Sequence, residues 1–164
     1  MDQVTLETAL LELGRAGHAA HALYVASNLE RSLEELIALR MPNLSNTLKE
    51  QLFTGYGPLS SFSARIDIAF ALDLIPANLR RDLHAIRHIR NHFAHATERV
   101  HFDSPKMEHL LKKFTDYTPG CDRLSFYLSK LDSCDAFLSP RTQTLMMANI
   151  LMSGSSKGKR SRGK

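Results

Sequence analysis

The spacing of apolar residues constrains the fold of this chain more than any other feature. Apolar positions recur every three to four residues through most of the sequence, which is the spacing of a helix with one buried face. Alternating runs of β-branched residues, which would indicate strands, do not occur. We therefore predict an all-α fold, a single-domain bundle of six or seven helices. With 164 residues, 43% of them hydrophobic, the chain is long enough to bury one core.

Glycine, proline and serine indicate where the expected helices begin and end. Gly14 and Gly17 are expected to separate two helices, a first one over 3–13 and a longer one over roughly 18–40. Ser60 or Ser61 is a suitable N-cap for a helix that runs to about residue 74. The remaining helices are expected at about 45–53, 77–95, 105–115 (capped by Ser104) and 140–152 (begun by Pro140), with a short one inside the ambiguous segment 119–139.

The positive charge of the chain is concentrated at its end. The formal net charge is +4, but the last twelve residues, SGSSKGKRSRGK, hold five basic residues and no acid, so the rest carries −1. We predict a helical domain over 1–152 and a basic, disordered tail over 153–164. The tail either attracts RNA or DNA weakly or serves only as a solubilising terminus. A body without net positive charge is unlike a DNA-binding domain.

The compartment is expected to be the cytoplasm. No stretch approaches 18 uninterrupted apolar residues, so we expect no membrane span. The N-terminus lacks the basic start and the cleavage site of a secretory signal. Cys121 and Cys134, the two cysteines, are expected to be reduced and structural.

The segment IRHIRNHFAH, residues 86–95, concentrates two arginines and three histidines in ten positions. Residues four apart lie on one helix face, so two adjacent columns form a side rich in hydrogen-bond donors. One column holds His84, His88 and His92, and the other holds Arg87, Asn91 and His95.

Three interpretations of this cluster compete. The histidine spacing would suit a metal, but no HExxH motif and no acid between the histidines accompanies it, so we expect no metal and no cofactor. In a phosphate site, Arg90 would hold the phosphate, Asn91 would orient it and His95 would move a proton, with Arg87, His88 and His92 as further phosphate or partner contacts. Alternatively, Arg90 and Asn91 only fix the helix to its neighbours, and His95 caps its end.

Two charged residues interrupt the apolar helix expected over 61–74. Arg65 and Asp67 should find partners in the packed bundle. We predict that Asp67 pairs with Arg87 or Arg90, and we include Arg65 and Asp67 among the candidate phosphate or partner contacts. The preceding GYGPLSS segment is either a turn and cap that sets a helix angle or an anion site at a helix N-terminus.

Two segments, which follow one another along the chain in the same order as in the family, resemble the mannitol repressor (MltR) family of bacterial regulators. GYGPLSSFSARID, residues 55–67, is similar to a G-x-G-P-L-x-x-x-S-x-R-I-D pattern, and DLHAIRHIRNHFAH, residues 82–95, is similar to an acidic helix of the family. The match covers about 40 residues, and 105–152 also resemble the family's C-terminal part. The resemblance implies a negative regulator of a sugar-alcohol operon.

A looser resemblance involves three residues. Arg90, Asn91 and His95 form R-N-x-x-x-H near the end of a helix, which is similar to the motif of the HEPN superfamily. That resemblance implies a helical, often dimeric protein, and in many members a metal-independent endoribonuclease in which Arg90 and His95 would work as a pair.

The leading functional hypothesis is thus a mannitol-repressor-type regulator acting through protein contacts as a homodimer. The runners-up are a HEPN-type endoribonuclease and a purely structural dimerisation module. A DNA-reading helix is disfavoured, because the helix–Gly–helix outline at ELGRAGHAAHALYVASNLERSL has a long, Ala/Leu-rich second helix. The expected partner is a regulatory or antitoxin-like protein.

Overall fold

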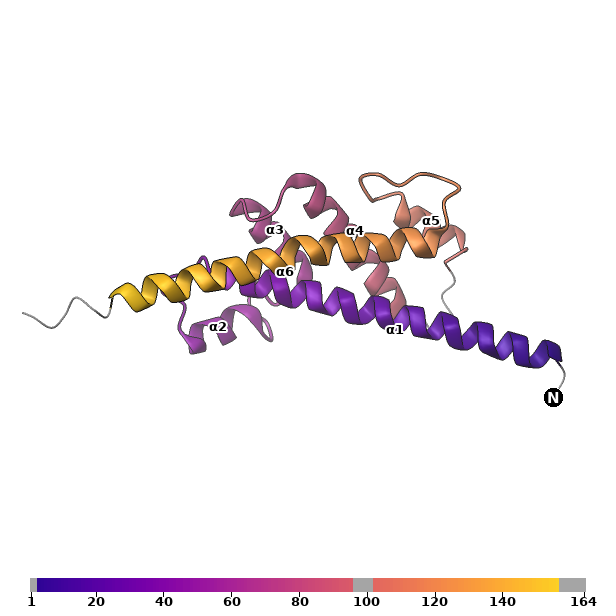
Figure 1. The fold of residues 1–164 in the computed structure, drawn as a ribbon, viewed down its shortest axis with the longest axis horizontal. Coiled ribbons are helices and arrows are strands. Elements are labelled where there is room, and N and C mark those ends of the chain that lie inside the picture. The colour runs from indigo at the N-terminus through magenta and orange to yellow at the C-terminus, as the bar shows by residue number, and fades with distance from the viewer. Residues whose placement is uncertain (1–2, 96–101, 157–164) are drawn as a thin grey trace, which may run out of the picture.

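The protein is a bundle of six packed helices in a computed structural model that describes residues 3–95 and 102–156, and the described residues contain no strand (Figure 1). The predicted all-α bundle is therefore confirmed. The helices are α1 (Gln3–Ala38), α2 (Asn46–Phe53), α3 (Phe62–Ala71), α4 (Ala77–His95), α5 (Pro105–Leu111) and α6 (Arg123–Ser156).

Two long helices form the spine of the bundle. α1 has 36 residues and α6 has 34, and the two pack side by side while running in the same direction in Figure 1. They are staggered, so the first part of α1 and the last part of α6 extend past the other helices at opposite ends of the molecule. α3 and α4 pack against α1, and α4 also contacts α5 and α6.

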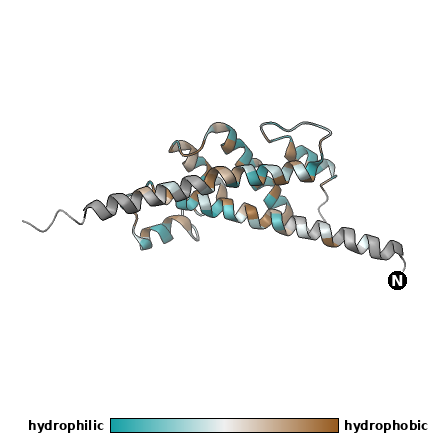
Figure 2. Ribbon diagram, viewed as in Figure 1, coloured by the Kyte–Doolittle hydropathy of each residue, from teal (hydrophilic) through white to brown (hydrophobic). Residues whose placement is uncertain are grey.

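The core lies where these helices meet. α1 contributes Leu29, Leu33 and Ile37, each without measurable exposure, and its hydrophobic turns stand out in the middle of the molecule in Figure 2. Contacts between aromatic rings continue the core toward α5. The ring centroid of Tyr127 lies 5.7 Å from that of Phe102 and 6.3 Å from that of Phe114. In the described residues, no helix is long and apolar enough to cross a bilayer.

Two predicted helix boundaries were wrong. α1 continues through Gly14 and Gly17, because glycine costs a helix only about 1 kcal/mol and does not remove a hydrogen bond. α6 continues through Pro140, where a new helix was expected. Proline in a helix interior costs about 3 kcal/mol, and the turns before it are held by Leu131, Cys134 and Leu138 in the core.

The serine caps were predicted correctly. The side chains of Ser61 and Ser104 accept hydrogen bonds from the backbone N–H groups of Ala64 and Met107 at the starts of α3 and α5. At the other end of the chain, α6 runs four residues past the predicted domain limit of 152, and the tail residues 157–164 lie outside the described residues.

The GYGPLSS segment packs its second glycine against the end of α2. A Cβ on Gly57 would collide with the backbone carbonyls of Gln51 and Leu52, whereas a Cβ on Gly14 would meet nothing within 4 Å. The N–H of Leu59 donates to the carbonyl of Leu52 at 2.8 Å and holds the turn in this close approach. The segment thus joins α2 and α3 tightly, as expected of a turn and cap that sets the angle between two helices.

This contrast predicts opposite effects for two glycine replacements. Gly57→Ala should destabilise the protein by about 1–3 kcal/mol, since backbone atoms must move. Gly14→Ala should stabilise it by about 0.5–1 kcal/mol, since alanine is the better helix former at an open position. Urea unfolding followed by circular dichroism measures both, and equal effects of the two variants would contradict the tight turn.

Candidate functional site

α4 carries the candidate site on the face that it turns away from the core. Its buried side chains are apolar in the main, with Leu83, Ile86 and Ile89 fully covered. The other face repeats polar residues at helical spacing, so cationic and histidine side chains line up along the helix axis. Two hollows follow this face, one toward each end of α4.

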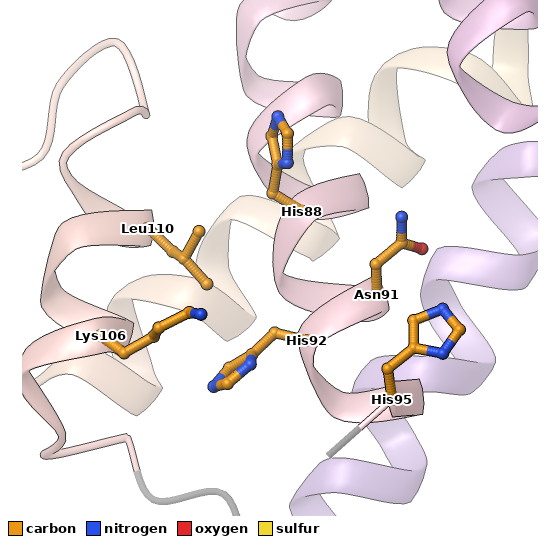
Figure 3. Close-up of a pocket in the computed structure, with 6 residues that line it drawn as sticks. All are labelled: His88, Asn91, His92, His95, Lys106 and Leu110. Carbon is orange, nitrogen blue, oxygen red and sulfur yellow. The ribbon is translucent and has the colours of Figure 1, made fainter.

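The first hollow, here called the histidine pocket, lies between the C-terminal half of α4 and α5 (Figure 3). Its volume is about 460 Å³. In Figure 3, Lys106 and Leu110 of α5 face His92 and His88 of α4, while Asn91 and His95 point to the other side of α4, where they lie close together. The six lining residues are His88, Asn91, His92, His95, Lys106 and Leu110.

The second hollow, here called the basic groove, lies between the N-terminal half of α4 and the end of α5. Its volume is about 490 Å³. Six of its eight lining residues are basic or titratable, and His88 belongs to this hollow as well as to the histidine pocket. The lining residues are Ala77, Arg80, Arg81, His84, Ala85, His88, Lys112 and Lys113.

Only part of this positive charge is neutralised. Asp67 of α3 accepts from Arg80 at 2.6 Å and from His84 at 3.1 Å, and Glu108 pairs with Lys112 at 3.2 Å. Three further cations of the two hollows have no acidic partner within 4 Å among the described residues: Arg81, Lys106 and Lys113. The face therefore carries an excess of unpaired positive charge.

His88 is held in its neutral form. Burial lowers its pKa below the ordinary 6.5, and the charges of Arg87, Lys113 and His84 lower it further. The contact with Arg87 agrees with this, since the guanidinium Nη2 lies 3.1 Å from His88 Nε2 and arginine can only donate. Nε2 must therefore be the accepting nitrogen of a neutral ring.

His92 behaves in the same way on the next turn. Burial lowers its pKa below 6.5, and the neighbouring charge of Lys106 adds to the effect. Both histidines are thus neutral acceptors or donors at neutral pH, and a negative ligand would return them toward protonation.

Arg90 lies apart from this surface. Its guanidinium pairs with Glu30 of α1 at 3.4 Å and stands 5.4 Å from the ring centroid of Phe62. Arg90 does not line the histidine pocket, whereas Asn91 and His95 do. Of the three residues of the R-N-x-x-x-H pattern, the structure thus brings two together, and it assigns Arg90 to the contact between α4, α1 and α3.

Arg65 and Asp67 both have charged partners in the packed bundle, as predicted, but the partners of Asp67 differ from the predicted ones. Asp67 pairs with Arg80 and His84, so the predicted pairing with Arg87 or Arg90 was wrong. The earlier turns of α4 face the exposed side of α3, which is why Arg80 and His84 reach it first. Arg65 is buried, and neither residue lines one of the hollows, although Asp67 holds two side chains that do.

Several site residues were missed from the sequence. Arg80 and Arg81 precede the conspicuous 86–95 segment, and Lys106, Lys112 and Lys113 lie in another helix or at its end. A signal was present for Arg80, since Arg80, His84 and His88 share the spacing of four that defined the histidine column. Nothing in the sequence shows that α5 lies beside α4.

The described residues offer no metal centre, and Cys134 is not a reactive thiol. Within 3–95 and 102–156, no three His, Cys, Asp or Glu side chains are grouped to hold a metal ion. Both cysteines are free, and burial raises the pKa of the Cys134 thiol to about 12, which leaves it protonated.

The comparisons with known proteins add no relative. No family model matches the chain, and no curated protein and no solved structure matches it significantly.

The two lowered histidine pKa values can be assigned separately. Lys113→Ala should raise the pKa of His88 and leave that of His92 unchanged, and Lys106→Ala should do the reverse, because each lysine acts on one ring. Titration of the ring C–H signals by NMR measures both. Since the folded pKa lies below that of the unfolded chain, stability should decline as pH falls from 6.5 toward the folded values. Wild-type midpoints at or above 6.5 would contradict this account.

Proposed function

We propose that this chain is a mannitol-repressor-type negative regulator of transcription that acts in the cytoplasm by contacting another protein. Membership of that family and the regulatory role rest on the resemblance of residues 55–67 and 82–95. The structure supports the choice of protein contacts over direct reading of DNA, as follows.

The continuity of α1 is the observation that carries this choice. The helix–Gly–helix outline at residues 12–33 would have to fold into two helices joined by a turn in order to present a recognition helix. It is one uninterrupted helix. α4, the helix with the most cations, packs against α1, α3, α5 and α6, so it does not protrude in the way that entry into a major groove requires.

A homodimer is part of the proposal. The first part of α1 and the last part of α6 extend past the other helices at opposite ends of the molecule (Figure 1). On the described part of α1, Leu13 is 71% exposed and Tyr24 is 66% exposed. Symmetric dimers of identical chains are the commonest soluble oligomers, and we assign the pairing surface to these extended helices.

The regulatory function predicts a defined transcriptional effect. Deleting the gene should raise the transcript of a sugar-alcohol operon, and the full chain supplied in trans should lower it again. The purified chain alone should not shift promoter DNA of that operon at physiological salt, because α4, which carries the most cations, packs within the bundle and offers no helix to a major groove.

Two results would contradict this proposal. An unchanged transcript profile in the deletion strain would remove the regulatory role. A salt-sensitive shift of the promoter DNA by the purified chain would mean that the protein binds DNA directly and not through another protein. If a chain without residues 153–164 gave the same shift, the basic tail would be excluded as the DNA-binding segment.

A metal-independent endoribonuclease is the second candidate. The observation that favours it is that Asn91 and His95 line the histidine pocket and lie close together on one side of α4 (Figure 3), so a proton carrier stands beside a hydrogen-bonding amide. The position of Arg90 at Glu30 speaks against an Arg90–His95 pair within one chain.

This candidate predicts cleavage of single-stranded RNA in the presence of EDTA, with 2′,3′-cyclic phosphate ends. His95→Ala should abolish the cleavage, since it removes the proton carrier. The matched control is His21→Ala, at an exposed position on α1. Gel analysis of labelled RNA reports both, and RNA that remains intact with the wild-type chain would eliminate the ribonuclease.

A further inference from the structure

The two hollows share His88 in their linings and follow the same helix one after the other, and together they are here called the α4–α5 furrow. It follows α4 from Arg80 to His95, a length of about 22 Å at the helical rise per residue. Cations line it from both sides, with Arg81 on α4 and Lys106 on α5, and Lys113 just beyond the end of α5. None of these three has an acidic partner among the described residues.

The floor of the furrow distinguishes between anionic partners. Ala85 and Leu110 are buried apolar residues that line the hollows between the charged groups. No Phe, Tyr or Trp side chain lines either hollow, and the only rings there are the imidazoles of histidines. Single-stranded nucleic acids are usually held by cations together with large aromatic rings on which the bases stack, and this furrow has no such large ring.

We propose that the α4–α5 furrow is the docking site for an acidic segment of the regulated partner protein. The segment places carboxylates against Arg81, Lys106 and Lys113, and small apolar side chains on Ala85 and Leu110. This inference rests on the proposed function, and it adds the chemistry of the partner and the place where it binds.

The histidines make this docking sensitive to pH. His88 is surrounded by Arg87, His84 and Lys113, and His92 faces Lys106, so both rings stay neutral in the free protein. The one acid that faces this cluster from α3 is Asp67, which His84 and Arg80 already occupy. A carboxylate placed in the furrow favours the protonated rings, so binding takes up protons and tightens below neutral pH.

A direct binding measurement tests the proposal. The probe is a labelled synthetic peptide of glutamate, alanine and leucine, with a matched peptide that carries lysine in place of glutamate, and fluorescence anisotropy of the full chain with each is recorded. The glutamate peptide should bind more tightly in mildly acidic than in neutral buffer, and the lysine peptide should not bind.

Charge reversal locates the site. The Lys106→Glu/Lys113→Glu double variant should weaken peptide binding about tenfold, as expected for losing two rim contacts. The matched control, Arg31→Glu/Arg40→Glu, changes the net charge equally at exposed positions outside the furrow and should bind as the wild type does. Circular dichroism confirms the folding of both variants.

The remaining outcomes separate this inference from the proposed function. If the glutamate peptide does not bind, or binds both double variants equally, the furrow is not the docking site. If a single-stranded oligouridylate binds the wild-type chain instead, and the Lys106→Glu/Lys113→Glu variant no longer binds it, the occupant of the furrow is RNA and the proposal is overturned. The proposed function stands or falls separately, on whether the deletion strain derepresses its operon.

Discussion

The guanidinium of Arg65 is the interaction on which the arrangement of the bundle depends. It is 7% exposed, and a charge buried to this degree is stable only if partners surround it. It donates to the carbonyls of Leu59 at 2.8 Å and Phe53 at 2.9 Å, and it pairs with Glu34 of α1 at 3.1 Å. One side chain thereby ties together the end of α2, the turn before α3, and α1.

The same acidic stretch of α1 also fixes α4. Glu30 lies 3.4 Å from Arg90, one turn before Glu34 on the same helix. With Arg90 held on that side, the register of α4 is set, and the face with His84, His88 and His92 points away from α1 toward α5. The excess positive charge of the candidate site thus lies on the exposed side of α4, whereas Arg90 pairs with Glu30 of α1 and holds the helix in place.

Much of the fold follows from the sequence, because a helix needs only local information: an apolar stripe, a cap and a terminator. Ser61 and Ser104 were predicted on that basis. Gly14 and Gly17 misled because glycine costs a helix only about 1 kcal/mol and removes no hydrogen bond. Pro140 misled because Leu131, Cys134 and Leu138 hold the preceding turns of α6 in the core, and this packing cannot be read from the segment alone.

The histidines that α4 contributes to the site were predictable from the sequence, but the residues that other helices contribute were not. The spacing of four placed His88 and His92 on one face of α4, where the structure has them, but the sequence does not indicate which helix lies opposite that face. The partners of Asp67 and Arg90 were therefore missed, and so were the lysines of α5.

The position of His88 at the junction of both hollows has a thermodynamic consequence. A ligand in the histidine pocket that changes the protonation of His88 also changes the charge that the basic groove presents, and the reverse holds by the same coupling free energy. Two such ligands on this face would therefore have linked affinities, with the proton on His88 as the link.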